Sequence, residues 1–435
     1  MQDKKLKVTG TGDALFVARF PKNYDSQKKG ISDFINSHDV KITNLETNLS
    51  DYGDFANAYS GGTWINTPKE YFDDLKSMGF NFYGTANNHC MDYSYHGMLS
   101  TIKVLDDNGV AHAGTGKDLA EAEKPTVLQI EDKKVAIFAI DASFNDASRA
   151  GRATNNFVGR PGVNFLRHST SYKVTQEQMQ SLKEIAKHTK INYNREFNIA
   201  TGYGTPDPEG VFVLGNTTFT TDQTKSTTEC NSKDKQRLVD LIKQAKQEND
   251  YVFVQIHCHD DDNVSHANPP EYLVEFCKAC IDAGASAIFG GGCHELRGIE
   301  IYNGKPIFYS LGDFIYQGPR VEKLPADFME QYGVDIFSTA EHALDVRSRG
   351  GKVGLHLNKE NYLTILPSLS YEGERLVDIK LLPVGLNFNK KDFTNGLPMI
   401  AEEEEQKEIL KVLNNLSKPF GTQFQLKEGW IVIKD

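Results

Sequence analysis

The glycine loop near residue 290 constrains the fold of this chain more than any other segment. An apolar strand pattern runs into Gly290-Gly-Gly-Cys-His294, and the sequence then continues to Gly312-Asp-Phe314. Glycine lets the backbone approach a ligand closely, and α/β enzymes present side chains in this way at the edge of a sheet. Four further polar clusters follow apolar runs elsewhere in the chain. We therefore expect an α/β protein with one active site built at the ends of several strands.

Strand and helix patterns alternate along the chain, as they do in a layered α/β fold. The apolar spacing predicts strands over 6–10, 40–42, 80–83 and 251–256, a hairpin over 126–140, helices over 68–78, 95–107, 170–189, 234–247 and 401–413, and two strands over 363–386. The segment 141–231 is rich in Gly, Asn, Thr and Ser and is expected to be a loop-rich insertion. We predict a core over 1–320 that carries this insertion, and a C-terminal segment over 321–435 whose strands and helix pack onto the core.

Charge and hydropathy limit the class of protein. The formal net charge is −11, and no stripe of Lys and Arg with interleaved aromatic residues occurs, which argues against nucleic acid as a partner. No run of about 18 apolar residues is present, and the amino-terminal residues lead into a strand pattern without a long apolar leader. We expect a soluble, cytoplasmic protein without a transmembrane segment. The sequence does not indicate the oligomeric state.

The six cysteines are expected to be reduced thiols, because their spacing is not that of a small disulfide framework. Cys277 and Cys280 lie inside a helical pattern over 271–283, where a packed helix face is more common than a redox or metal pair. Cys258 lies between two histidines, and Cys293 precedes His294. These two placements make both thiols candidates for the site.

Polar side chains follow the predicted strands where each strand ends, and this is where open α/β sheets gather ligands and catalytic groups. These residues are Asp13, Glu46, Asn88, His89, His257, His259 and His294. Carboxylate, amide and imidazole donors suit Zn, Mn or Fe at a site that activates water. His257 and His259 give the most specific signal, because the period of two along a strand directs both rings to one face. Taken singly, Asp13 is also typical of an Asx turn, and the Asn-Asn-His run is typical of loop capping.

Several motifs together resemble those of a known family. They are Gly12-Asp13, Asn44-Leu-Glu46, Ala86-Asn-Asn-His89, His112-Ala-Gly-Thr-Gly, His257-Cys-His259, His294-Glu-Leu-Arg297 and Asn303-Gly-Lys-Pro-Ile-Phe-Tyr-Ser-Leu-Gly312. The chain resembles the CapA, or poly-γ-glutamate synthesis protein, family of the calcineurin-like metallophosphatase superfamily. It is similar to the longer branch of that family at Ser60-Gly-Gly-Thr-Trp64, Arg160-Pro-Gly-Val-Asn164 and Leu416-Ser-Lys-Pro-Phe-Gly-Thr422. The resemblance runs from near the amino terminus to the end of the chain.

This resemblance implies a four-layer αββα fold, a metallophosphatase-like sandwich of two mixed β-sheets flanked by helices, with the site at the strand ends. It implies metal ligands at Asp13, Glu46, Asn88, His257 and His259, of which Glu46 would bridge two metals. It makes His89 an acid or an orienting group, and His294 the last histidine of the glycine-histidine loop. Members of such a family can be membrane-associated.

Two departures from the family pattern bear on the metal. The family usually writes its loop as Gly-His-x-Pro-His, whereas this chain has Gly291 at the first histidine and Cys293 at the proline. Leu15 stands where a histidine usually follows the first aspartate. We therefore expect one divalent metal (Zn, Mn or Fe) rather than a phosphatase-type pair, with metal-free operation as the alternative.

Three functions are compatible with these residues. The first is hydrolysis or transfer at an amide of a peptide or γ-glutamyl substrate such as polyglutamate, with a metal that lowers the pKa of water. The second is a metal-independent peptide epimerase, in which Asp13 and His294 are the acid/base pair across a substrate carbon and Cys293 or Cys258 is a thiol partner. The third is a non-catalytic role in assembly or export of a capsule polymer. Retention of the carboxylate, amide and imidazole donors favours the first.

Arginines in this acidic protein suggest how a carboxylate-bearing substrate would bind, because guanidinium groups bind carboxylates in a bidentate manner. One loop contains Arg149, Arg152, Arg160 and Arg167. We take Arg160 as the candidate for substrate binding, although surface pairing of these arginines with Asp141 and Asp146 is equally compatible. Arg297, three residues after His294, is a second candidate, either to touch substrate or to orient Glu300.

Overall fold

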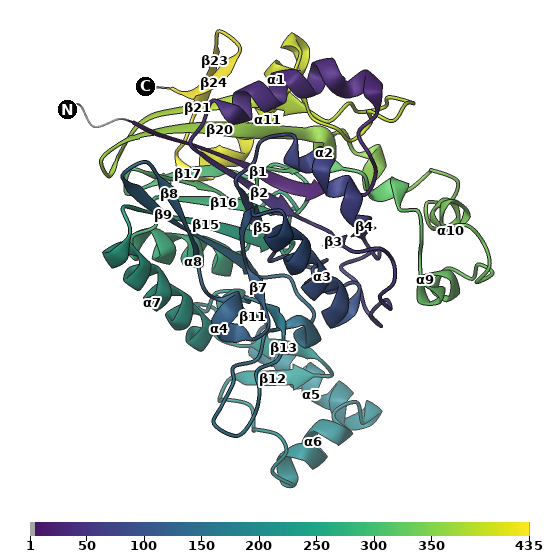
Figure 1. Cartoon of the computed structure of the whole chain (residues 1–435). Helices are drawn as coiled ribbons and strands as arrows, with labels where there is room; N and C mark the ends of the chain where they lie inside the picture. The colour runs from purple at the N-terminus through teal and green to yellow at the C-terminus, as the bar shows by residue number, and fades with distance from the viewer. Residues whose placement is uncertain (1–4, 435) are drawn as a thin grey trace.

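The computed structural model describes residues 5–434 and contains two large sheets packed face to face (Figure 1). Within these residues, the first sheet has ten strands in the order β23-β24-β21-β20-β1-β2-β5-β6, with β19 beside β1 and β22 beside β21. The second sheet has six strands in the order β17-β18-β16-β15-β9-β8. Both sheets contain parallel and antiparallel pairs, so the predicted mixed α/β class is confirmed.

The strands of the first sheet are β1 (Leu6–Leu15), β2 (Val40–Leu45), β5 (Phe82–Gly84), β6 (Ala111–Ala113), β19 (Asp313–Tyr316), β20 (Leu363–Glu372), β21 (Arg375–Gly385), β22 (Met399–Ile400), β23 (Phe424–Lys427) and β24 (Trp430–Ile433). Those of the second are β8 (Thr126–Ile130), β9 (Lys133–Asp141), β15 (Tyr251–Cys258), β16 (Ala287–Gly292), β17 (Ile299–Tyr302) and β18 (Lys305–Phe308). Short pairs join β3 (Asn48–Leu49) to β4 (Asn66–Thr67) and β7 (Thr115–Gly116) to β10 (Gly162–Val163).

The core between the sheets follows from the period of two along each strand. Phe253 of β15 packs with Phe289 of β16 and with Val8 and Ile42 of the first sheet. Val252 and Val254, the intervening residues on β15, pack instead in the cluster on the outer face of the second sheet. Because His257 follows Phe253 at even spacing, its side chain is directed between the two sheets at their edge.

Helices cover both outer faces (Figure 1). The first sheet carries α1 (Asp25–Asn36), α2 (Phe72–Lys76) and α3 (Ser94–Asp107), and the second carries α7 (Ser232–Glu248) and α8 (Glu271–Asp282). The remaining helices are α4 (Leu119–Ala122), α9 (Ala326–Gln331), α10 (Ala340–Arg347) and α11 (Glu403–Ser417) in this part of the molecule, and α5 (Gln176–Thr189) and α6 (Tyr193–Ala200) in the insertion. Among the described residues, no helix is long and apolar enough to cross a membrane.

The insertion forms a small unit at the bottom of Figure 1, where α5 and α6 lie beside a separate four-stranded sheet. Its strands follow the order β12 (Val211–Leu214), β13 (Thr217–Thr220), β11 (His168–Lys173) and β14 (Thr228–Cys230). The prediction of one helix over 170–189 is wrong at its start, because residues 168–173 pair with β13 and β14. The helix begins after Thr175, whose side chain closes a capping box with Gln178.

The C-terminal strands extend the first sheet, since β20 pairs antiparallel with β1 and β21 follows it. Cys277 and Cys280 are both buried on α8, which confirms the packed helix face. All six cysteines are free thiols. Strand β19 also pairs with β1, and this pairing sets Asp313 beside Asp13. The fold therefore brings residues from opposite ends of the chain to one sheet edge.

Candidate active site

Strand ends from both sheets meet at one place, and most of the predicted site residues lie there. β1 and β2 run parallel in the first sheet, as do β15 and β16 in the second. The carboxyl ends of these strands, with the loop after β5, supply Asp13, Glu46, Asn88, His89, His257, His259 and His294. The structure thus brings together all seven residues that were identified from their position after strands.

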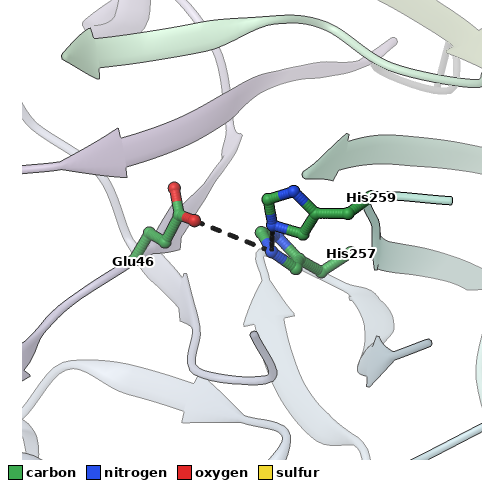
Figure 2. Close-up of side chains that lie close together, drawn as sticks. All are labelled: Glu46, His257 and His259. Atoms are coloured by element: carbon green, nitrogen blue, oxygen red, sulfur yellow. Dashed lines mark hydrogen bonds and ion pairs between the residues drawn. The ribbon is translucent and has the colours of Figure 1, made fainter. Parts of the chain in front are cut away.

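Four of these residues form a group that we call the imidazole cluster: Asn88 together with Glu46, His257 and His259. Figure 2 shows the last three. The Nε2 atoms of the two histidines lie 3.1 Å apart, and Asn88 Oδ1 lies 2.8 Å from His257 Nε2. Glu46 Oε1 lies 3.7 Å from the same nitrogen. Two nitrogen donors and two oxygen donors therefore converge on one small volume.

Glu46 shows that this donor set fits a divalent cation. Its side chain is fully buried, yet neither carboxylate oxygen has a hydrogen-bond partner among residues 5–434. A buried carboxylate without a partner is costly, and such groups are normally paired or coordinate a metal. Imidazole nitrogen with carboxylate and amide oxygen suits Zn, Mn or Fe. The residues present would hold such an ion.

The residues of the imidazole cluster differ in the direction of their pKa shifts. Burial, together with the negative charge of Asp13, raises the pKa of Glu46 to about 7. Burial, together with the charge of His257, holds the pKa of His259 well below its ordinary value, so this ring is neutral and offers a lone pair. Burial also lowers the pKa of His257, but the adjacent Asp13 carboxylate outweighs it and the net value rises to about 9. Nδ1 of His257 therefore faces Asp13, and its Nε2 faces Glu46, Asn88 and His259.

A second group, which we call the carboxylate cluster, contains Asp13, Glu46, His294 and Asp313. One ligand atom from each lies within 4.8 Å of the others. Asp13 Oδ1 accepts from Asn44 Nδ2 at 2.6 Å, and Oδ2 accepts from the Gly292 amide at 2.5 Å. Burial raises the pKa of Asp13, but the charge of His257 and its hydrogen bond outweigh burial and the net pKa is lowered. Asp13 is therefore an ionised carboxylate held from both sides.

Gly291 explains one departure from the family pattern. A Cβ atom at this position would lie 2.5 Å from Asp13 Oδ1, closer than real Cβ contacts allow. The missing side chain is what lets Asp13 reach the Gly292 amide. A histidine at 291 would displace the Asp13 carboxylate from its present position.

His294 is held in an unusual backbone conformation. Its φ is +61°, in the left-handed region, where a non-glycine residue is retained only if the surroundings fix it. Asn361 Nδ2 donates to its carbonyl at 2.8 Å, and Asp313 Oδ1 lies 2.9 Å from its Nδ1. Burial lowers the pKa of His294, but Asp313 outweighs it and the net pKa lies well above the ordinary value. The ring is therefore oriented and kept protonated by Asp313.

The segment Ser60–Trp64 orients the remaining site residues. Asn88 Nδ2 donates to the Gly61 carbonyl at 2.9 Å, which turns Oδ1 toward His257. Asp92 accepts from the Gly61 and Ile65 amides and lies 2.6 Å from His89 Nδ1. A Cβ at Gly61 would lie 2.6 Å from Asn88 Nδ2, so only glycine lets this segment approach Asn88 so closely.

The two cysteines that were predicted to act at the site are buried and contact other protein groups. Cys293 is fully buried and its thiol donates to the Glu295 carbonyl. Cys258 is also buried, with its Sγ 3.2 Å from Tyr272 Oη, and burial raises its pKa to about 12, so it is a neutral thiol. Neither side chain lines the cavities that adjoin the site.

Arg297 was expected to touch substrate or orient Glu300, and its position gives it a structural role instead. The side chain is fully buried, and its guanidinium donates to the carbonyls of Cys258, His259, Asp260 and His266. Arg297 thus fixes the loop that carries His259. Glu300 pairs with Tyr309 and Lys278. Arg160 donates to the Arg149 carbonyl and lines neither of the two cavities that adjoin the site.

Two residues of the site were given no role from the sequence. Asp313 follows Gly312 just as Asp13 follows Gly12, and this repeated Gly-Asp pair could have identified it. Asp92 lies three residues after His89, a spacing that could have suggested the pair.

Two cavities adjoin the site and share Gly61 and His259 in their walls. The insertion-side cavity, about 470 Å³, reaches Asn88 and is lined by Arg167 and His168. The α10-side cavity, about 640 Å³, reaches His89 and His294 and is lined by Arg347. His259 of the imidazole cluster therefore lies in the wall that the two cavities share.

Comparison with known families gives a match over most of the chain. Residues 7–318 match the family described as "Bacterial capsule synthesis protein PGA_cap". The chain is 30% identical over 432 residues to "Uncharacterized protein y4sH" of Sinorhizobium fredii (strain NBRC 101917 / NGR234), covering 97% of this chain and 91% of that protein.

The names of two further relatives refer to PGA or capsule biosynthesis. "PGA biosynthesis protein CapA" of Bacillus subtilis (strain 168) is 27% identical over 253 residues, which are 58% of this chain and 47% of that protein. "Capsule biosynthesis protein CapA" of Bacillus anthracis is 23% identical over 323 residues, which are 72% of this chain and 61% of that protein. The solved structure "GAP50 the anchor in the inner membrane complex of Plasmodium" gives a TM-score of 0.33 at 10% identity over 98% of each chain, a likeness too low to carry an argument.

Proposed function

Because this chain belongs to the bacterial capsule synthesis protein PGA_cap family, we propose that it is a metal-binding enzyme that hydrolyses or transfers an amide of a γ-glutamyl or other carboxylate-bearing peptide substrate. The names of two relatives, which refer to PGA and capsule biosynthesis, support the substrate class. The two face-to-face sheets with helices on both outer faces support a metallophosphatase-like four-layer sandwich as the fold.

The Glu46 carboxylate, which is buried without a hydrogen bond, is the observation that carries this proposal. Its nearest charged neighbours are the rings of His257 and His89 at 3.7 and 3.9 Å, and such a carboxylate beside two imidazole nitrogens and an amide oxygen is a donor set that suits a cation. A divalent metal bound there supplies Lewis acidity and lowers the pKa of water. Glu46, Asn88, His257 and His259 would hold it.

The carboxylate cluster supplies the proton transfers of hydrolysis. Asp13 stays ionised and can accept a proton from the attacking water at a carboxylate oxygen. As water oxygen bonds to the carbonyl carbon and the carbon–nitrogen bond breaks, His294 can donate a proton from Nε2 to the leaving nitrogen. Asp313 holds the ring at Nδ1 and stabilises its charge. The products are a carboxylate and an amine.

The second candidate function is peptide epimerisation by Asp13 and His294. What favours it is that both groups are fixed by protein neighbours, Asp13 by Asn44 and Gly292 and His294 by Asp313. Their separation opposes it. Reacting atoms approach to about 3–3.5 Å, so a carbon between a base and an acid on opposite faces needs about 6 Å or more between them. An oxygen of Asp13 and a ring nitrogen of His294 lie within 4.8 Å.

The experiment that tests the proposal combines metal content with two assays. Plasma mass spectrometry of protein purified without chelator should find about one transition metal per chain, and the metal should be lost in His259→Ala. Wild-type protein should release amine from γ-glutamyl oligomers. Deuterium uptake from solvent into a peptide α-carbon, without amine release and without metal, would favour epimerisation. A metal-free protein with neither activity would contradict both functions and favour a non-catalytic role.

A further inference from the structure

Two cavities, rather than one, adjoin the site. Gly61 and His259 line both cavities, and the rest of the two linings differs. The insertion-side cavity continues toward Phe144 and His168, whereas the α10-side cavity continues toward Tyr316 and Arg347. A substrate that reaches the imidazole cluster therefore has room on both of its sides.

We propose that the substrate is an extended chain that occupies both cavities, so that an internal amide lies at the metal donors, and that Arg347 binds a carboxylate of this chain in the α10-side cavity. The inference rests on the proposed function, because it names the substrate length and the anchoring residue of that same site. Its chemical class is an oligoamide with regularly spaced carboxylates.

Arg347 is suited to this role because its charge is not neutralised. The side chain is half-buried, its guanidinium donates to Thr63 Oγ1, and it lies 5.6 Å from the centre of the Phe328 ring. Glu341 and Asp345 line the same cavity, but within residues 5–434 no carboxylate lies at ion-pair distance from Arg347. The guanidinium is thus oriented by neutral groups and keeps donors for an anion.

The arginine in the other cavity differs in this respect. Arg167 donates to both carboxylate oxygens of Asp234 at 2.7 and 2.8 Å, so its positive charge is neutralised by that carboxylate. Of the two arginines that line the cavities, Arg347 is therefore the one free to bind a substrate carboxylate.

The Ser60–Trp64 segment links Arg347 to the metal donors. Thr63 accepts from Arg347, and Gly61, two residues earlier, accepts from Asn88 Nδ2. A carboxylate at Arg347 and an amide at the imidazole cluster are thus positioned by one short segment. This arrangement fixes the register of a chain with regularly spaced carboxylates.

The test uses full-length, metal-loaded protein with oligo-γ-glutamates of different lengths as probes. We expect kcat/KM to be at least about tenfold higher for a decamer than for a dimer, with cleavage at internal bonds. Arg347→Gln should raise KM for the decamer about tenfold or more with kcat nearly unchanged, since it removes binding shared by ground and transition states. Arg347→Lys should restore part of the loss. Arg349→Gln, the same charge change outside both cavity linings, is the control and should match wild type.

The outcomes separate this inference from the proposed function. Equal kcat/KM for dimer and decamer, or a wild-type KM in Arg347→Gln, overturns the inference while the enzyme activity stands. If metal-loaded wild type turns over no oligomer, the proposed function fails, and calorimetric binding of the decamer then decides the inference, because absent or Arg347-independent binding overturns it. An oligo-α-glutamate decamer run in parallel shows which backbone carries the carboxylates.

Discussion

The imidazole cluster and the carboxylate cluster share Glu46 but differ in how their polar atoms are satisfied. In the imidazole cluster, the Glu46 oxygens have no hydrogen-bond partner among the described residues, and His259 is neutral with its Nε2 facing another nitrogen. In the carboxylate cluster, Asp13 accepts two strong hydrogen bonds, and His294 is matched to Asp313. The shared Glu46 carboxylate and Asp313 Oδ2 lack hydrogen-bond partners among the described residues, whereas Asp13 and the His294 ring are held by protein neighbours.

This difference indicates that the two clusters have different roles, metal binding and proton transfer, although their residues are chemically similar. Unsatisfied donors arranged around a point are what a metal ion requires, because coordination replaces the missing hydrogen bonds. Groups that the protein has already fixed and whose pKa values are set apart are suited to carry protons. We therefore interpret the imidazole cluster as the metal-holding half of the site and the carboxylate cluster as the proton-transferring half.

Glu46→Gln should have the largest effect, because it removes the one residue common to both halves. We expect turnover to fall more than about 100-fold with loss of bound metal, since even outer-sphere partners of metal ligands are worth 10–100-fold. Metal-free protein should respond in the opposite sense and become more stable, because an amide costs less to bury than a carboxylate that has no hydrogen bond. Metal content and thermal unfolding with and without metal measure both effects. Loss of metal-free stability together with retained metal would break the assignment.

His294→Ala tests the other half. Turnover should fall about 10²–10⁴-fold, the range of a general acid, while metal content stays at the wild-type level. Cys230→Ala is the control, because this cysteine lies at β14, away from both clusters, and should leave turnover unchanged. Loss of metal in His294→Ala would show that the two halves are a single metal centre.

The sequence placed Glu46 and His257 near the ends of β2 and β15 because side-chain position along a strand is a local property. The prediction was wrong for the end of β1, which was expected at Gly10 with Asp13 in the turn, because β1 continues through Asp13 to Leu15. Arg297 could not be placed in the same way. Arg297 is buried and donates to carbonyls of the 258–266 loop, a contact between segments about 30–40 positions apart that a local pattern does not reveal.

Contacts between distant parts of the chain were beyond sequence reasoning. Asp313 reaches Asp13 only because β19 pairs with β1 across 300 residues, and Arg347 reaches Thr63 across a similar separation. Residues 170–173 were predicted as the start of a helix from their local pattern, yet they pair with residues that lie 47 or 58 positions later in the chain. Tertiary pairing outweighs local propensity at each of these places.

The Gly61→Ala substitution tests whether metal binding by the imidazole cluster depends on the Ser60–Trp64 segment, which contributes no metal ligand. The new Cβ would lie 2.6 Å from Asn88 Nδ2, so the amide must shift and its Oδ1 must leave its position near His257. We expect metal affinity to weaken about 10–100-fold, measured by competition with a chelator. Gly53→Ala is matched to it, because a Cβ there meets no atom within 4 Å. Unchanged affinity in Gly61→Ala would show that Asn88 is not a ligand.

Asp313→Asn should give the smallest effect and the most specific one. The Asp313 carboxylate raises the pKa of His294 well above its ordinary value, against the lowering effect of burial. If protonated His294 is the acid, activity is lost as pH rises through that pKa, so removing the charge should move the alkaline limb of the pH–rate profile to lower pH. Metal content should not change, because the imidazole cluster keeps its four donors. A rate that falls equally at every pH would assign Asp313 to the metal instead, and would merge the two halves that the geometry separates.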